Sequence, residues 1–500
     1  MAITQNDIIY FIITDRFYGV QNLNPDVQKK IDRSNPFFYH GGNIPGIIEK
    51  IPYLKKLGVT ALWITPVYLQ IDLPTVHGYH GYWALDFNQI DPQFYIDNGK
   101  YPKNSKLYLK DLTDELHKNG IKLILDMVVN HTGYGHPAKT NAEDNPTPIR
   151  SNWFNQEGLS CNIDEIQGEL AALPDLDLDS HDVSDYHITT IIDWVRQTGI
   201  DAVRMDTVKH VEKKFWYDFK TQVKGVCNDL SLLGEVLVFD IGTLSDYQKY
   251  YDFDCLFDFP MQQAIRSVFI DDESFHLLYS PFERGHGILE KDHWYTNQNK
   301  LSTLLDNHDL SARYMTWAMG RHHNNKAPAV IVYNLSLTYM FTIRGIPQLY
   351  YGNEIGLEGG SDPDNRRDFP WEVFDDKYDV KSNYKFEKEI FDHTCHLIKI
   401  RKENAALTSG DLVCLYVDHF IFSYMRYVEN NILIVVLHNG WMDMPEAVTI
   451  NIDANNGIPE RIKSQIRNKK INCQLTGKEI EIKSGAFSIQ LSGKTGVILK

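Results

Sequence analysis

The sequence LILDMVVNH at residues 123–131 is an apolar run of strand length that ends in polar side chains. The same arrangement recurs in DAVRMDTVKH at 201–210, LLGEV at 232–236 and LLDNHD at 304–309. Each run is short, rich in aliphatic residues and bounded by polar or turn-forming residues, as a buried strand is. Segments with helical periodicity lie between the runs. This alternation is typical of βα units around a parallel sheet.

The same alternation extends over the first four fifths of the chain and predicts eight strands. Helices at 46–56 and 107–119 fit between them, and Gly120 follows the second helix as a carboxyl-terminal cap should. Eight such units predict an α/β protein built on a closed (β/α)₈ TIM barrel. The predicted strands lie at residues 8–14, 61–65, 123–128, 202–205, 232–235, 255–259, 302–305 and 348–351.

Two parts of the chain depart from this alternation. A polar stretch rich in Gly, Asn and Pro follows the third strand, and it is too long to be a simple connection. After residue 401 the pattern changes to alternating runs such as FIFSYMRYV at 420–428. We therefore expect a barrel from 1–132 and 181–402, a small inserted domain at 133–180 and a C-terminal all-β sandwich at 403–500.

Composition excludes several classes of partner. The chain has 500 residues and a formal net charge of −16, which would repel the phosphates of a nucleic acid. The first 15 residues lack the features of a secretory signal, and no apolar run reaches membrane-spanning length. We expect a cytoplasmic protein that binds neither nucleic acid nor membrane, although removal of a secretory signal would leave the same start.

Four carboxylates fall at the ends of predicted strands, where the working residues of such a barrel lie. Any one of them could be a helix cap or half of a structural ion pair, but four beside His or Arg indicate a catalytic site. Arg204 stands two residues before one of them, so both side chains point to one face and the guanidinium can keep that carboxylate ionised. A purely structural ion pair is the alternative. The four are Asp126, Asp206, Glu235 and Asp309.

These strings resemble the short sequence regions of glycoside hydrolase family 13, the α-amylase family. Further matching strings are DIIYFIITDRF at 7–17, GVTALWITPVY at 58–68, YHGYW at 79–83, LPDLD at 173–177 and DPDNRR at 362–367. The resemblance covers nearly the whole chain. It implies a catalytic barrel, an inserted domain B after the third strand and a C-terminal β-sandwich domain C.

The resemblance implies that Asp206 is the nucleophile, Glu235 the general acid/base and Asp309 the third carboxylate, which stabilises the transition state. Retaining hydrolysis needs one ionised and one protonated carboxyl group about 5 to 5.5 Å apart. The pKa values of the two groups must therefore be pushed apart.

The resemblance also implies a set of residues that bind the substrate. Tyr82 would stack beneath the sugar being transferred, the −1 position. Side chains around that sugar, on the leaving side and on the donor side would complete the set. They are His131 and His308 at −1, Lys209 and His210 on the leaving side, Asp362 and Arg366 on the donor side, and Arg204 beside the nucleophile.

One structural calcium between the barrel and domain B is implied as well. Its ligands would be Asn130, Asp175 and the backbone carbonyl of His210, since calcium prefers hard oxygen ligands of mixed type. A fourth ligand should come from domain B, where Asp164 and Glu165 are candidates.

The function that follows is endo-acting hydrolysis of α-1,4-glucosidic bonds in starch, glycogen or maltooligosaccharides by double displacement, in a monomer. A transglycosylase of the same mechanism is the alternative, because a sugar hydroxyl can replace water as acceptor. A noncatalytic glucan-binding or transporter-associated member is a further possibility. The presence of all three catalytic carboxylates and Arg204 argues against it.

Overall fold

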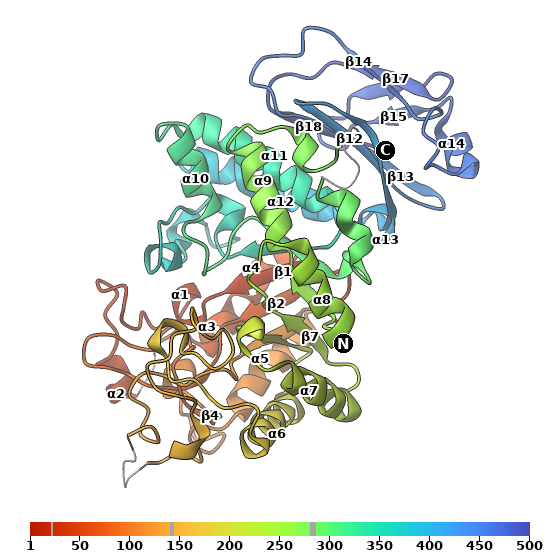
Figure 1. Cartoon of the computed structure of the whole chain (residues 1–500). Coiled ribbons are helices and arrows are strands. Elements are labelled where there is room, and N and C mark those ends of the chain that lie inside the picture. Colours follow the sequence, from red (N-terminus) through yellow and green to blue (C-terminus); the bar gives the residue numbers. More distant parts are fainter. Residues whose placement is uncertain (22–23, 141–144, 281–286) are drawn as a thin grey trace.

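The computed structural model describes residues 1–21, 24–140, 145–280 and 287–500. Eight strands pair in parallel and close into a barrel in which neighbouring strands follow the order of the chain (Figure 1). This confirms the predicted (β/α)₈ barrel. Its strands are β1 (Ile9–Ile12), β2 (Ala61–Ile64), β5 (Lys122–Met127), β6 (Ala202–Met205), β7 (Ser231–Gly234), β8 (Cys255–Phe257), β9 (Leu301–Leu304) and β10 (Ile346–Tyr350).

Helices connect the strands and cover the outside of the barrel. The helix predicted at 46–56 is in fact two helices, α3 (Ile44–Glu49) and α4 (Ile51–Leu57). Pro52 occupies the first turn of α4, and proline is tolerated at a helix start but not in a helix interior. The other helices of this part are α1 (Thr14–Phe17), α2 (Pro25–Gln28), α5 (Leu107–Lys118), α6 (His181–Thr198), α7 (Lys213–Val226), α8 (Ile241–Tyr251), α9 (Phe259–Phe269), α10 (Tyr314–Arg321), α11 (Lys326–Thr342), α12 (Lys385–Lys402) and α13 (Ala405–Ser409).

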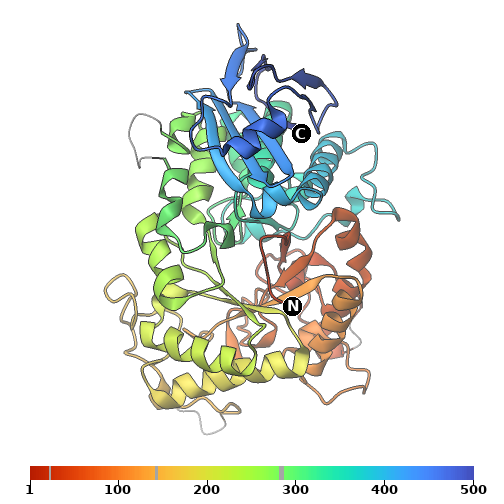
Figure 2. The ribbon, with the colours of Figure 1, turned by 90° about the vertical axis from the view of Figure 1, so that its right-hand side faces the viewer.

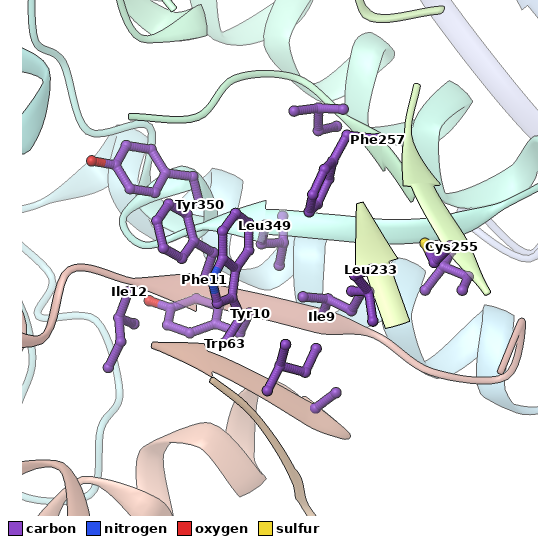
Figure 3. Packing of buried hydrophobic residues seen from close by; sticks show 14 of the residues in the cluster. Ile9, Tyr10, Phe11, Ile12, Trp63, Leu233, Cys255, Phe257, Leu349 and Tyr350 are labelled. Carbon is purple, nitrogen blue, oxygen red and sulfur yellow. The ribbon is translucent and has the colours of Figure 1, made fainter. Parts of the chain in front are cut away.

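Aromatic rings fill the inside of the barrel. The ring of Phe11 stacks on Trp63 at a centroid distance of 3.7 Å and on Tyr350 at 5.2 Å. Trp63 in turn stacks on Phe257 at 5.2 Å (Figure 3). Such bulky side chains make the interior a packed core rather than a pore. They form a rigid support for the polar residues at the carboxyl ends of the strands, where His308 touches the edge of Phe11 at 4.9 Å.

Two excursions interrupt the barrel. The first is an antiparallel pair, β3 (Tyr68–Gln70) and β4 (Ala84–Ile90), which follows β2 and was not predicted. The second follows β5 and corresponds to the predicted domain B. Its described residues, 133–140 and 145–180, contain only short 3₁₀ turns, including η3 (Leu170–Ala172), and isolated bridges such as Phe154↔Leu176.

The C-terminal part is an antiparallel β domain, as predicted. Its main sheet has the order β11-β12-β13-β18, and two small two-stranded sheets accompany it. One short helix, α14 (Glu460–Ile466), interrupts the strands, so the expectation of an all-β domain was too simple. The strands are β11 (Asp411–Val417), β12 (Ile421–Val428), β13 (Asn431–His438), β14 (Val448–Asn451), β15 (Lys470–Asn472), β16 (Glu479–Glu481), β17 (Ala486–Ile489) and β18 (Thr495–Leu499).

The β domain packs against helix α11 of the barrel, and Figure 2 shows it on one end of the molecule. Two buried arginines bind the carboxyl end of that helix. Arg401 of α12 donates to the carbonyl of Phe341 at 2.9 Å, and Arg426 of β12 donates to the carbonyl of Thr342 at 3.2 Å. Carbonyls at a helix end lack partners within the helix, and cations there also interact favourably with the helix dipole. Arg426 therefore ties the β domain to the barrel, whereas Arg401 binds the helix end from within the barrel.

Among the described residues, no helix combines the length and the apolar character that crossing a bilayer requires.

Candidate active site

One buried arginine lies among all four carboxylates that the sequence placed at strand ends. The Nη1 atom of Arg204 lies 2.6 Å from Asp206 Oδ1 and 2.9 Å from Asp126 Oδ1. Its Nη2 atom lies 3.5 Å from Glu235 Oε2 and 4.0 Å from Asp309 Oδ2. The barrel thus brings the predicted nucleophile, acid/base and third carboxylate around a single cation.

Glu235 holds its proton at neutral pH. Burial raises the pKa of its carboxyl group to about 8, and the negative charges of Asp206 and Asp309 act in the same direction, while Arg204 opposes them. Its Oε2 atom accepts a hydrogen bond of 2.9 Å from the backbone N–H of Thr207. A buried carboxylic acid beside an Arg-paired carboxylate is the division of roles that a retaining glycosidase requires.

Asp309 joins the centre of the site to the donor side. Its Oδ2 atom lies 3.4 Å from His308 Nε2, and its Oδ1 atom lies 3.6 Å from Arg366 Nη2. Arg366 also pairs with Asp362 at 3.3 Å. Burial raises the pKa of Asp309, and the two arginines counteract this. The predicted donor-side pair is therefore connected to the predicted catalytic carboxylates through a chain of ionic contacts.

No catalytic or binding role was predicted for Asp126, yet its carboxylate accepts hydrogen bonds from three side chains. It is fully buried, and besides Arg204 it accepts hydrogen bonds from the Tyr82 hydroxyl at 2.8 Å and from Trp63 Nε1 at 3.1 Å. It therefore holds both the arginine and the tyrosine ring predicted to lie beneath the sugar. Its place near the end of β5 was visible in the sequence, but its partners come from segments that are far apart in the chain.

Two histidines offer free nitrogens to a ligand. Burial lowers the pKa of both His131 and His308, so both rings are neutral at neutral pH. Within the described part of the chain, His131 Nε2 and His308 Nδ1 are buried without a hydrogen-bond partner. His308 also stacks on Tyr82 at 5.4 Å. Buried polar atoms are rarely left unpaired, so these atoms are suited to sugar hydroxyls.

On the leaving side, one acidic residue engages both predicted substrate contacts. Lys209 Nζ lies 3.3 Å from Glu165 Oε1, and His210 Nδ1 lies 3.0 Å from the backbone carbonyl of Glu165. Glu165 belongs to the domain B segment, so this contact joins domain B to the loop after β6.

A cavity of about 530 Å³ connects these groups. All predicted catalytic and substrate-binding residues line it except Arg204, which is buried beneath it. Residues of domain B, of the loop between β3 and β4, and of the segments after β6 and β7 complete the wall. These additional lining residues are His80, Trp83, Tyr134, Cys161, Asn162, Leu170, Ala171, Leu173, Thr207 and Leu237.

Of the predicted calcium ligands, His210 lines this cavity, whereas Asn130 and Asp175 do not. Asp175 pairs with His131 in an isolated bridge, next to Asn130, and its Oδ2 atom accepts a 2.8 Å hydrogen bond from Asn155. Its Oδ1 atom is buried without a partner among the described residues, and burial raises the pKa of the carboxyl group to about 8. Glu212 has a similarly unpartnered Oε1 atom and raises the Asp175 pKa further.

These groups fit a calcium ion by the chemistry of their donors, since all are hard oxygen atoms. No group of three or more His, Cys, Asp or Glu side chains at metal-binding distance occurs in the described residues. An ion here would therefore need amide and carbonyl oxygens as well. Of the two candidates for the fourth ligand, Asp164 accepts the backbone N–H groups of Ile166 and Gln167, and Glu165 faces Lys209.

The sequence profile of the alpha amylase catalytic domain matches residues 11–410. The chain belongs to the α-amylase family, glycoside hydrolase family 13. Two α-amylase family relatives resemble it over most of its length. It is 29% identical to the "Beta/alpha-amylase" of Paenibacillus polymyxa over 97% of this chain, but spans only 37% of that protein. It is 29% identical to "Neopullulanase 2" of Thermoactinomyces vulgaris over 98% of this chain and 77% of that protein.

A solved structure of this family has a closely similar fold. The crystal structure of an Anoxybacillus α-amylase superposes with a TM-score of 0.82 and 32% sequence identity, covering 100% of this chain and 98% of that one. The family membership supports an α-glucan as substrate.

Proposed function

We propose that this chain is a retaining hydrolase that cleaves internal α-1,4-glucosidic bonds of starch, glycogen or maltooligosaccharides. The observation that carries the proposal is the arrangement around Arg204, with Asp206 at 2.6 Å and the protonated Glu235 at 3.5 Å. The residues predicted to bind the leaving side and the donor side line the same cavity as these carboxylates, which fits cleavage within a chain. The similarity to the Anoxybacillus α-amylase over both full chains also supports it.

In the first step, Asp206 attacks the anomeric carbon and Glu235 gives its proton to the departing glycosidic oxygen. The bond to the leaving glucan breaks, and an ester between the sugar and Asp206 forms. In the second step, the ionised Glu235 takes a proton from water, whose oxygen displaces Asp206. Each displacement inverts the anomeric centre, so the product has the α configuration of the substrate.

Proton NMR during the first minutes of maltoheptaose hydrolysis tests this mechanism. The first product should be the α-anomer, before mutarotation mixes the two forms. An initial β-anomer would mean a single inversion and would refute the double displacement.

Analysis of products over time distinguishes hydrolysis from transfer. We expect amylose to give maltooligosaccharides shorter than the substrate, with slower attack on pullulan and cyclodextrins. Products longer than a maltotriose substrate would instead identify a transglycosylase. Faster turnover of cyclodextrins than of amylose would contradict the preference for internal bonds of linear chains.

We further propose one structural calcium held by Asn130, Asp175 and the backbone carbonyl of His210. The unpartnered oxygen of Asp175 supports this site, and the unpartnered oxygen of Glu212 makes it a candidate for a fourth ligand. A bound calcium would neutralise these buried acids and join domain B to the barrel.

A further inference from the structure

We propose that Glu165 is a positioning residue that fixes Lys209 and thereby sets the affinity for sugars on the leaving side of the cleft. The inference rests on the proposed function, because it assumes that a glucan occupies the cavity. Glu165 touches no catalytic carboxylate. Its effect passes through the ammonium group of Lys209, which lines the cavity.

The segment that carries Glu165 is held in one shape by its own hydrogen bonds. Asp164 Oδ1 accepts the backbone N–H groups of Ile166 and Gln167 at 3.0 and 3.1 Å. The two ends of the segment are joined, because Cys161 N–H donates to the Glu169 carbonyl at 3.2 Å. The position of Glu165 is therefore set by domain B and not by Lys209.

Close packing at Gly168 supports this fixed shape. A Cβ atom there would lie only 2.4 Å from the Asp164 carbonyl oxygen, so the turn closes too tightly for any other residue. The segment can thus present a side chain at a defined place.

Glu165 contacts Lys209 and His210 through two different groups. Its carboxylate pairs with Lys209 at 3.3 Å, whereas its backbone carbonyl pairs with His210 Nδ1 at 3.0 Å. A change of the side chain therefore releases Lys209 and leaves the contact to His210 in place. This separation makes the role of the carboxylate testable on its own.

A lysine side chain is long and flexible, and its ammonium group has three donors. The ion pair with Glu165 restricts the side chain, while the ammonium group keeps donors for sugar hydroxyls in the cavity. A side chain that is already restricted loses less conformational entropy when a sugar binds, so binding is more favourable. Glu165 should therefore favour occupation of the leaving side, both by a long substrate and by a sugar acceptor.

The test compares Glu165→Gln with the parent on two substrates. Maltoheptaose places glucose units on the leaving side, whereas 4-nitrophenyl α-maltoside can react with an aryl group there instead. We expect KM for maltoheptaose to rise up to about fivefold, the range of a half-exposed ion pair, with kcat within about twofold. The aryl substrate should show no change in either constant. Glu157→Gln, an exposed acid in the same domain, is the matched control and should behave like the parent.

A second variant shows whether Glu165 acts through Lys209 or independently of it. In a Lys209→Met background, Glu165→Gln should have no further effect on KM, since the residue that it positions is gone. An unchanged KM for Glu165→Gln, equal losses on both substrates, or full additivity with Lys209→Met would overturn the positioning role. Absence of activity in the parent on every α-glucan would instead refute the proposed function itself.

Discussion

The guanidinium of Arg204 lies 3.5 Å from Glu235, yet the pKa of Glu235 is raised to about 8. Burial has the larger effect on this acid, and the nearby Asp206 adds a like charge. Arg204 makes its shorter contact, 2.6 Å, with Asp206. Arg204 thus pairs most closely with the proposed nucleophile, while the acid beside it keeps its proton.

Asp206→Asn should abolish turnover while the fold persists. A neutral amide of similar shape cannot form the glycosyl ester, so we expect kcat to fall by at least about a thousandfold. Asp246→Asn, an exposed change on α8, is the control and should keep parental activity. Assays on maltoheptaose, with circular dichroism to verify folding, measure the effect. Residual activity within about tenfold of the parent would rule out this nucleophile.

Glu235→Gln should inactivate the enzyme but raise its thermal stability at alkaline pH. The folded protein keeps the Glu235 proton up to about pH 8, whereas an unfolded glutamate loses it near pH 4.3. Between these values folding takes up a proton, so the free energy of unfolding contributed by this group falls as pH rises. A glutamine does not titrate, so the variant does not lose this free energy of unfolding as pH rises.

We therefore expect the Tm difference between variant and parent to increase from pH 5 to pH 8, reaching about 1 to 3 °C. Differential scanning calorimetry at both pH values measures it. The same Tm difference at the two pH values would contradict the raised pKa.

Asp126→Asn should weaken both stability and catalysis. The amide has only one acceptor oxygen, and its NH₂ group would face hydrogen-bond donors that now bind the second oxygen of Asp126. Buried Arg204 would also lose an anionic partner. Loss of a buried partner of this kind costs about 3 kcal/mol of unfolding free energy. Displacement of Tyr82 and Arg204 should lower kcat/KM by about a hundredfold. Urea unfolding and kinetics on maltoheptaose measure the two effects. Parental values for both would show that Asp126 holds neither residue in place.

Prolonged treatment with a strong calcium chelator should lower the Tm of the parent, and added calcium should restore it. An ion bound only to the folded state stabilises that state by mass action. In Asp175→Asn the response to chelator should be smaller, because the proposed site loses its carboxylate. An unchanged parental melting curve, together with metal analysis that finds no calcium, would remove Asn130 and Asp175 from the ligand set.

The barrel was predictable because each strand is a buried apolar run followed by polar residues. The strand ends also brought the catalytic candidates together, since all parallel strands end on one face of the barrel. The pair β3 and β4 was missed, because β3 has only three residues and β4 mixes buried and half-buried positions without a regular alternation. Pro52 could have indicated the break between α3 and α4.

Contacts between segments that are distant in the chain could not be predicted from the sequence. Nothing near Glu165 in the chain shows that it faces Lys209, 44 positions later, or that Asp126 accepts from Tyr82 and Trp63. Such pairs depend on how domain B folds over the strand ends, which no local pattern encodes. The domain limits, the monomeric state and the cytoplasmic location stay predictions.

The two arginines at the end of α11 have a consequence for synthesis on the ribosome. Arg401 belongs to α12 of the barrel, whereas Arg426 belongs to β12, 84 positions after the Thr342 carbonyl that it binds. The Thr342 carbonyl at the end of this barrel helix is therefore bound by Arg426 only when β12 has emerged, after all eight barrel strands. A nascent chain paused before that point leaves this carbonyl exposed, together with the face of α11 that packs on β13 and β18, so chaperone binding should persist until the β domain has formed.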